Sequence, residues 1–218
     1  IDGTGAPSRV ADVAVTADRI SKIGIGLEAG DAEQIDASGL VLAPGFIDAH
    51  THDDRIVLAD PAMKCKVSQG VTTVVTGNCG ISIAPVVVSQ RPPAPLDLIG
   101  EEPAAFFASF AEYFDTLDSA PPAVNVIAQV GHSSLRVMAM SEVDRPATPA
   151  EIDAMCIALQ QALEDGAAGL STGLAYHPAR AAPTDEVTAL AAVTAGVQGN
   201  QVPGKDHGGP QKRVSATK

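Results

Sequence analysis

Two histidines stand one residue apart at the end of an apolar segment, GLVLAPGFIDA, which covers residues 39–49. Residues i and i+2 of a β-strand face the same side, so the imidazoles of His50 and His52 can converge on one cation. Imidazole nitrogens are ligands that suit Zn²⁺. Asp48 shares this face by alternation and is expected to orient a ligand imidazole or to be a solvated acid. The pattern predicts a zinc site, and the alternative is a pair of surface histidines in a turn.

A cysteine follows the next β-branched segment, VTTVVTG at 71–77. The small neighbours of Cys79 in TGNCG let its sulfur approach a metal, and a thiolate is a strong ligand for Zn²⁺. The alternative is a buried thiol that packs as a small hydrophobe. Cys65 and Cys156 lie in helical patterns and are expected to pack. Three scattered cysteines suit a reducing compartment, so a cytoplasmic location is expected.

Other polar residues follow two later strand-like segments. His132, in GHSSLR, is a candidate for substrate binding, with a hydrogen-bonded structural histidine as the alternative. Arg136 can grip a carboxylate with its bidentate fork, but an intramolecular ion pair is the simpler expectation. Tyr176 is the second candidate for substrate binding, and His177 is expected to be a loop residue. The residues alone identify no catalytic general base.

The order of apolar patterns predicts the elements that position these residues. The β-branched and apolar segments favour buried parallel strands, because such strands are covered on both faces. Amphipathic segments between them favour helices. Thr148, Pro149 and Glu151 form an N-terminal capping pattern before the clearest of these helices. The strands are expected at 39–52, 71–77, 123–131 and 166–174, and the helices at 61–70, 103–119, 148–166 and 184–195.

Strand and helix alternate, which indicates an α/β fold with a parallel sheet. About four βα units are present, whereas a closed (β/α)8 barrel needs about 250 residues. The expected domains are a small antiparallel β piece at 1–40 and the first half of a barrel at 41–195. Residues 196–218 contain no Leu, Ile, Phe or Met and are expected to be an unrelated, disordered tail.

Composition excludes several classes of function. Apolar residues make up 45% of the 218-residue chain, which is enough to form a core. The formal net charge of −12 argues against binding to nucleic acid or to an anionic membrane. No apolar run reaches the roughly 18–20 residues that a membrane span needs. Nucleic acid and membranes are therefore not expected partners.

Several segments together resemble the N-acyl-D-amino-acid deacylases, or D-aminoacylases, of the amidohydrolase superfamily. The resemblance covers about residues 1–193 and rests on the segments IDGTGAP, GLVLAPGFIDAHTHDD, QGVTTVVTGNCGISIAP, EYFDTLDSAPPAVNVIAQVGHSSLR and EDGAAGLSTGLAYHPARAAPTDEVTALA. It implies a metal-dependent (β/α)8 barrel beside a small β domain, which hydrolyses N-acyl-D-amino acids to a carboxylate and a D-amino acid. It also implies that His50, His52 and Cys79 are zinc ligands and that Tyr176 contacts the substrate.

The family's remaining zinc histidines come from the fifth and sixth strands and its catalytic aspartate from the eighth. Nothing after about residue 194 matches these strands, so we expect a truncated or frame-shifted product that lacks the later ligands and the general base. One alternative is a non-catalytic metal-binding fragment that assembles with a partner chain. Another is a cyclic-amide hydrolase of the dihydroorotase or hydantoinase kind, which the absence of lysine from AAGLSTGL at 167–174 disfavours. The substrate's side chain and acyl group, the number of metal ions and the oligomeric state stay open.

Overall fold

The computed structural model describes residues 1–199. Their contacts divide the chain into two compact units, with Ile1–Phe46 in one and the described residues from Ile47 onward in the other. This division falls six residues beyond the predicted boundary at residue 40. Most of the predicted tail, residues 200–218, lies outside the described part of the chain.

The first unit is built on one antiparallel hairpin. Strand β1 (Asp12–Thr16) pairs with β2 (Arg19–Gly24), with Asp12 opposite Gly24. The Asp12 carboxylate accepts hydrogen bonds from the backbone N–H groups of Gly26 and Leu27, at 2.7 and 3.1 Å. These bonds fix the chain as it leaves β2. The antiparallel β element expected within residues 1–40 is confirmed in this form.

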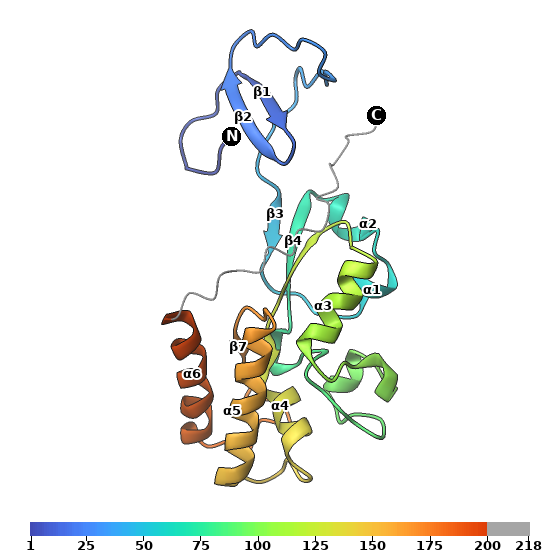
Figure 1. The fold of residues 1–218 in the computed structure, drawn as a ribbon, viewed down its shortest axis with the longest axis vertical. Helices are drawn as coiled ribbons and strands as arrows, with labels where there is room; N and C mark the ends of the chain where they lie inside the picture. The colour runs from blue at the N-terminus through green and yellow to red at the C-terminus, as the bar shows by residue number, and fades with distance from the viewer. Residues whose placement is uncertain (200–218) are drawn as a thin grey trace. The chain divides into compact units, whose positions relative to one another are not determined.

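Parallel strands form the framework of the second unit (Figure 1). One sheet has the order β3 (Phe46–Asp48), β4 (Val71–Thr76) and β5 (Asn125–Ala128), and β4 and β5 are parallel. A second pair, β6 (Val130–Gly131) and β7 (Leu170–Ser171), is also parallel. The four segments predicted to be strands therefore each contain at least one strand. The third is interrupted at Gln129 and supplies both β5 and β6.

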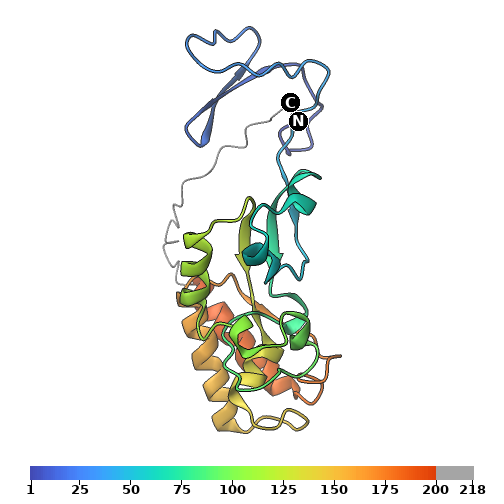
Figure 2. The same ribbon diagram turned by 90° about the vertical axis from the view of Figure 1, so that its right-hand side faces the viewer.

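Six α-helices and three 3₁₀ turns lie between or after these strands within the described residues. Helices α5 and α6 lie side by side (Figures 1 and 2). The α-helices are α1 (Ile56–Ala59), α2 (Lys64–Val67), α3 (Phe110–Ser119), α4 (His132–Ala139), α5 (Pro149–Glu164) and α6 (Thr184–Gly199). The 3₁₀ turns are η1 (Asn78–Gly80), η2 (Leu96–Leu98) and η3 (Pro103–Ala105).

The predicted start of α5 is confirmed in detail. The Thr148 side chain accepts a hydrogen bond from the Glu151 N–H, and the Glu151 carboxylate accepts one from the Thr148 N–H. Pro149 occupies the first turn, where its missing N–H costs no hydrogen bond. Helix α6 begins at Thr184 as predicted and continues four residues past the expected end at 195.

The helix predicted over 103–119 begins later, at Phe110. The N–H of Phe107 donates to the carbonyl of Ile83, and the carbonyl of Phe107 accepts from the N–H of Val86. These bonds hold Phe107 in extended pairing with a distant segment and exclude it from a helix. Ser109 then caps α3 by accepting a hydrogen bond from the N–H of Glu112. The first half of this prediction was therefore wrong.

The apolar segment at 39–49 is also less buried than predicted. Only Phe46–Asp48 forms a strand, and the side chains of Phe46 and Ile47 are 65% and 64% exposed. The reason is that the described residues give β3 one neighbouring strand, β4, and no second layer over these two side chains. An apolar run thus signalled a strand but not its burial.

The core of the second unit lies between its strands and helices α3 to α6. It is aliphatic, with a few aromatic rings from α3. Among residues 1–199, no helix has both the length and the apolar character that a bilayer crossing requires. Fully buried core side chains include Val57, Met63, Val74, Phe110, Tyr113, Leu135, Met155, Leu159 and Leu190.

Candidate metal centre

The structure brings His50, His52 and Cys79 together. One ligand atom from each residue lies within 4.8 Å of the other two, and His50 Nε2 is 3.2 Å from Cys79 Sγ. Ligands on one tetrahedral zinc ion are separated by roughly 3.3–3.6 Å, given the usual bond lengths to nitrogen and sulfur. Small side-chain rotations would bring these atoms to that spacing. We call these three residues the candidate metal centre.

The two histidines are positioned by Thr51, the residue between them. Its N–H and its hydroxyl both donate to the carbonyl of Val75 in β4, at 3.1 and 3.0 Å. The Asn78 side-chain amide donates to the carbonyls of Thr51 and Val75, at 3.2 and 2.8 Å. The histidines lie beyond the end of β3, so the pinned Thr51 holds them in place. The sequence analysis did not single out Thr51 or Asn78.

Cys79 occupies a strained backbone conformation. Its φ of 56° and ψ of 22° lie in the left-handed region. A non-glycine residue there costs roughly 1–3 kcal/mol and persists only when its surroundings enforce it. A Cβ at Gly77 would lie 2.1 Å from the carbonyl oxygen of Gln129, and one at Gly80 would lie 2.7 Å from the nitrogen of Gly173. The loop that carries Cys79 is therefore packed backbone against backbone.

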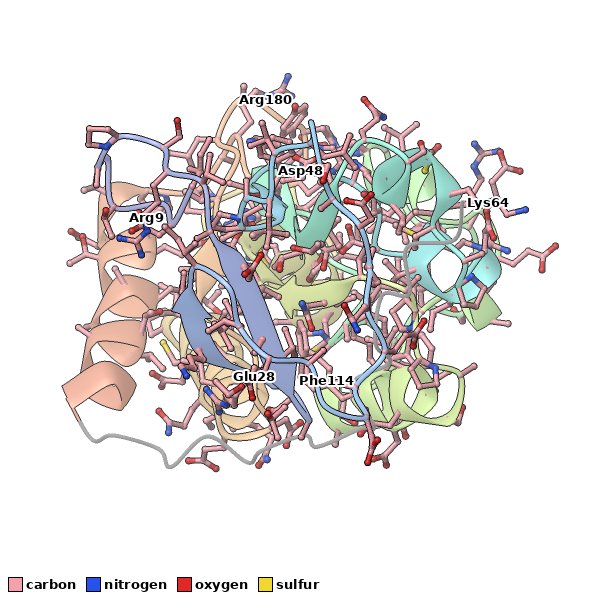
Figure 3. All side chains as sticks on the ribbon, turned by 90° about the horizontal axis from the view of Figure 1, so that it is seen from above. Arg9, Glu28, Asp48, Lys64, Phe114 and Arg180 are labelled. Carbon is pink, nitrogen blue, oxygen red and sulfur yellow. The ribbon has the colours of Figure 1, made fainter. Side chains whose placement is uncertain are left out.

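A lysine joins the carboxylates on either side of the histidines. Lys66 Nζ lies 2.7 Å from Asp48 and 2.9 Å from Asp53. Its hydrogen bond holds the pKa of Asp48 below its usual value. Asp48, labelled in Figure 3, thus pairs with a lysine, a partner that the sequence analysis did not consider. This bridge ties α2 to both flanks of residues 50–52, which we call the histidine segment.

Local electrostatics favour the neutral form of His52. Partial burial lowers the pKa of His52 from its usual 6.5, and the nearby His50 lowers it further, while Asp53 opposes both effects. Metal binding requires an unprotonated imidazole. The environment of His52 therefore favours its ligand form near neutral pH.

Asp54 follows the histidine segment in the chain and is only 1% exposed. Burial raises the pKa of Asp54 to about 6, and hydrogen bonds from the backbone of Gly77 and Ile83 partly oppose that rise. The hydroxyl of Tyr113 donates to the backbone carbonyl of Asp54 at 3.3 Å. Asp54 thus anchors the end of the histidine segment in the core.

His132 lies in a different environment. Its side chain is buried, with Nδ1 3.1 Å from Thr172 Oγ1 and Nε2 2.7 Å from Glu186 Oε1. Arg136 Nη1 donates to both oxygens of the Glu186 carboxylate, at 2.5 and 2.6 Å. We call His132, Arg136 and Glu186 the buried ion-pair cluster. Both nitrogens of the ring already have protein partners, which favours the structural alternative; its substrate-binding role stays a prediction.

The ion pair expected for Arg136 is therefore present, with a partner that the sequence did not reveal. Glu186 lies in the first turn of α6, a common place for an acid, so its type and position gave no signal. Burial by itself raises the pKa of Glu186, but the hydrogen bonds from His132 and Arg136 outweigh it and lower that pKa below its usual 4.5. The carboxylate is thus held in its charged form.

Tyr176 lies in the loop after β7 with 40% of its side chain exposed. It packs close to the loop that carries Cys79, residues 77–80, through Gly173, where an added Cβ would lie 2.2 Å from the carbonyl oxygen of Cys79 and 2.7 Å from the Tyr176 ring. The role of Tyr176 in substrate binding stays a prediction. His177 is a loop residue as expected, and its Nε2 lies 2.8 Å from Asp144.

The sequence and the fold of this chain are both similar to those of known proteins. The sequence profile of the amidohydrolase family matches residues 33–216. The chain is 54% identical, over 187 residues, to the N-acyl-D-aspartate deacylase of Alcaligenes xylosoxydans xylosoxydans. That alignment covers 86% of this chain and 37% of the relative, so the chain spans well under half the relative's length.

Two solved structures are similar in fold. One is a D-aminoacylase whose binuclear metal centre was examined; it is 51% identical, has a TM-score of 0.83, and is matched over 87% of this chain and 40% of its own. The other is the N-acyl-D-glutamate deacylase of Bordetella bronchiseptica with zinc and a phosphonate mimic of the tetrahedral intermediate. It is 48% identical with a TM-score of 0.82, over 89% of this chain and 41% of its own. The predicted α/β barrel fold class is confirmed.

Proposed function

Because this chain belongs to the amidohydrolase family, we propose that it acts in the hydrolysis of N-acyl-D-amino acids to a carboxylate and a D-amino acid. The observation that carries the proposal is the convergence of His50, His52 and Cys79. Identity of 46–54% to three deacylases of N-acyl-D-amino acids supports the substrate class. The acyl group and the amino-acid side chain are left unassigned.

The proposed cofactor is Zn²⁺. The ion would be held by His50, His52 and Cys79. Two imidazoles and a thiolate bind zinc in preference to harder cations. When bound, zinc lowers the pKa of water toward roughly 7 and polarises a carbonyl group. The presence of zinc in the Bordetella bronchiseptica deacylase supports this choice of ion.

The residues of this chain have distinct proposed roles. Thr51 and Asn78 fix the histidines to the end of β4, and the strained loop holds the sulfur opposite His50. The exposed ring of Tyr176, beside that loop, is proposed to contact the substrate. We assign no general base among residues 1–199. The three unpaired cysteines support a reducing compartment, and we propose a cytoplasmic location.

Zinc binding and hydrolysis test the proposal separately. Equilibrium dialysis followed by metal analysis should show zinc bound by the full chain and lost in His50→Ala and Cys79→Ser. Cys156→Ser is the matched control, because Cys156 lies in α5 outside the centre, and it should bind zinc normally. Equal zinc content in all four proteins would contradict the proposed centre.

The second measurement is hydrolysis of N-acetyl-D-amino acids with zinc, compared with their L-enantiomers. Turnover of the D-substrates alone would support the proposed activity. Zinc binding without turnover of either enantiomer would favour the alternative of a metal-binding chain that is not itself catalytic.

A further inference from the structure

The loop that carries Cys79 is bridged by one serine from a distant strand. The Ser171 hydroxyl donates to the carbonyl of Gly77 and accepts from the N–H of Gly80 at 3.0 Å. Gly77 and Gly80 are the first and last residues of the metal loop, residues 77–80, and Ser171 lies more than ninety residues away in sequence. A hydroxyl is suited to this position because it is both a donor and an acceptor.

We propose that Ser171 is a positioning residue that holds Cys79 in its ligand conformation. The inference deepens the proposed function, because it rests on the metal centre proposed above. Cys79 occupies the left-handed region at a cost in free energy. Relaxation of the loop to an ordinary backbone conformation would therefore lower its free energy. The two hydrogen bonds of Ser171 oppose that relaxation by joining the backbone on either side of Cys79.

Strand pairing fixes Ser171 itself. Strand β7 is parallel to β6, with Gly131 opposite Ser171, and the N–H of Val130 donates to the carbonyl of Gly169 at 2.8 Å. The backbone of β6 also approaches the metal loop closely, because a Cβ at Gly131 would lie 2.6 Å from the carbonyl oxygen of Gly80. The pairing of β6 with β7 therefore presents the hydroxyl to the loop from an element of regular structure, as positioning of a ligand requires.

The opposite side of the loop has a separate anchor. The Asn78 amide binds the carbonyls of Val75 and Thr51, which ties the loop to the histidine segment. Asn78 thus holds the loop toward the histidines, whereas Ser171 closes its other side. Loss of Ser171 should leave the histidine pair in place and free the sulfur, which lies 3.2 Å from His50 Nε2.

Ser134 provides a matched control within the same unit. Its hydroxyl accepts from the N–H of Ser82 at 2.8 Å and donates to the carbonyl of Ser82 at 3.0 Å. It is a serine with the same pair of bonds to backbone, but it touches no residue of the metal loop 77–80 in these bonds. Ser134→Ala therefore reports the general cost of removing such a hydroxyl.

The experiment uses Co²⁺ as a spectroscopic probe in the full chain, because a thiolate ligand gives Co²⁺ a distinct charge-transfer band. Wild type and Ser134→Ala should show the band, and Cys79→Ser should lack it. Ser171→Ala should bind Co²⁺ about 10–100-fold more weakly, the usual effect of losing an outer partner of a ligand, with a diminished thiolate band. Ser171→Thr, which keeps a hydroxyl, should recover the band.

The outcomes separate the two proposals. A wild-type spectrum without a thiolate band, or one that Cys79→Ser leaves unchanged, would overturn the metal centre and this inference with it. A normal wild-type band that Ser171→Ala retains at equal affinity would overturn the inference alone. Equal losses in Ser171→Ala and Ser134→Ala, with equal falls in metal-free thermal stability, would show a general packing effect and would also overturn it.

Discussion

Two histidine-containing clusters in the second unit use similar residues in opposite ways. In the candidate metal centre, His50 and His52 are exposed, and the nitrogen of His50 faces the sulfur of Cys79. In the buried ion-pair cluster, His132 and its carboxylate partner Glu186 are both fully buried. In the candidate metal centre, the ligand atoms are grouped closely enough to share one cation. In the buried ion-pair cluster, both ring nitrogens of His132 are already within hydrogen-bond distance of protein partners.

The difference follows from the energetics of burial. A buried charge is costly unless it is paired and hydrogen-bonded, so the Glu186 carboxylate is surrounded by donors from Arg136 and His132. The exposed imidazoles of His50 and His52 carry no such requirement, so their nitrogens stay available to a cation. Saturation by protein partners, more than residue type, distinguishes a structural histidine from a candidate ligand.

The largest expected effect is on stability in the buried cluster. Glu186→Gln leaves Arg136 without its buried counter-charge, and breaking such a pair costs about 3–5 kcal/mol of unfolding free energy. Urea denaturation measures it. The control is Glu101→Gln, which removes an exposed ion pair with Arg91 and should cost at most about 1 kcal/mol. Equal losses in the two variants would erase the distinction between the clusters.

The next effect is on metal affinity in the candidate metal centre. His50→Ala removes a proposed ligand, so zinc affinity should fall by more than the roughly 100-fold that loss of an outer partner can cost. Because His50 is exposed, the metal-free unfolding free energy should change by no more than about 0.5 kcal/mol. Competition with a chromogenic chelator measures affinity. A large loss of metal-free stability would instead make His50 a structural residue like His132.

A smaller effect concerns residues 172–173, which lie between the candidate metal centre and the buried ion-pair cluster. Gly173 packs on the Cys79 carbonyl, and its neighbour Thr172 bonds to His132. Gly173→Ala would place a methyl group 2.2 Å from that carbonyl oxygen, and such overpacking costs roughly 1–3 kcal/mol. We expect zinc affinity to fall as well. Gly169→Ala is the control, since a Cβ there meets no atom within 4 Å. Unchanged zinc affinity in Gly173→Ala would show that the metal loop tolerates displacement.

The smallest effect is a dependence of stability on acid. The folded pKa of Glu186 lies below its usual 4.5, so its contribution is present above pH 4.5 and is lost as the pH falls through the lower folded value. The difference in unfolding free energy between wild type and Glu186→Gln, measured from pH 6 to pH 3, should therefore narrow on the acid side. A constant difference over this range would contradict the charged state that we assign to Glu186.

Local patterns predicted much of this structure. The capping residues around α5 and the β-branched run of β4 act through near neighbours in the chain, so their outcome was visible in the sequence. The spacing of His50 and His52 likewise marked a pair of possible ligands. The sequence could not decide whether His132 is a structural residue or a substrate-binding residue. Its partners Thr172 and Glu186 lie 40 and 54 residues away in the chain.

Tertiary structure decided the rest. The start of α3 depended on backbone pairing between Phe107 and the segment around Ile83, and the exposure of β3 depended on which layers cover it. The meeting of Cys79 with His50, and of Ser171 with the metal loop, depended on segments far apart in the sequence, whose glycines approach one another closely. Sequence spacing determines which side chains share a face, whereas burial and hydrogen-bond partners depend on atoms that only folding brings together.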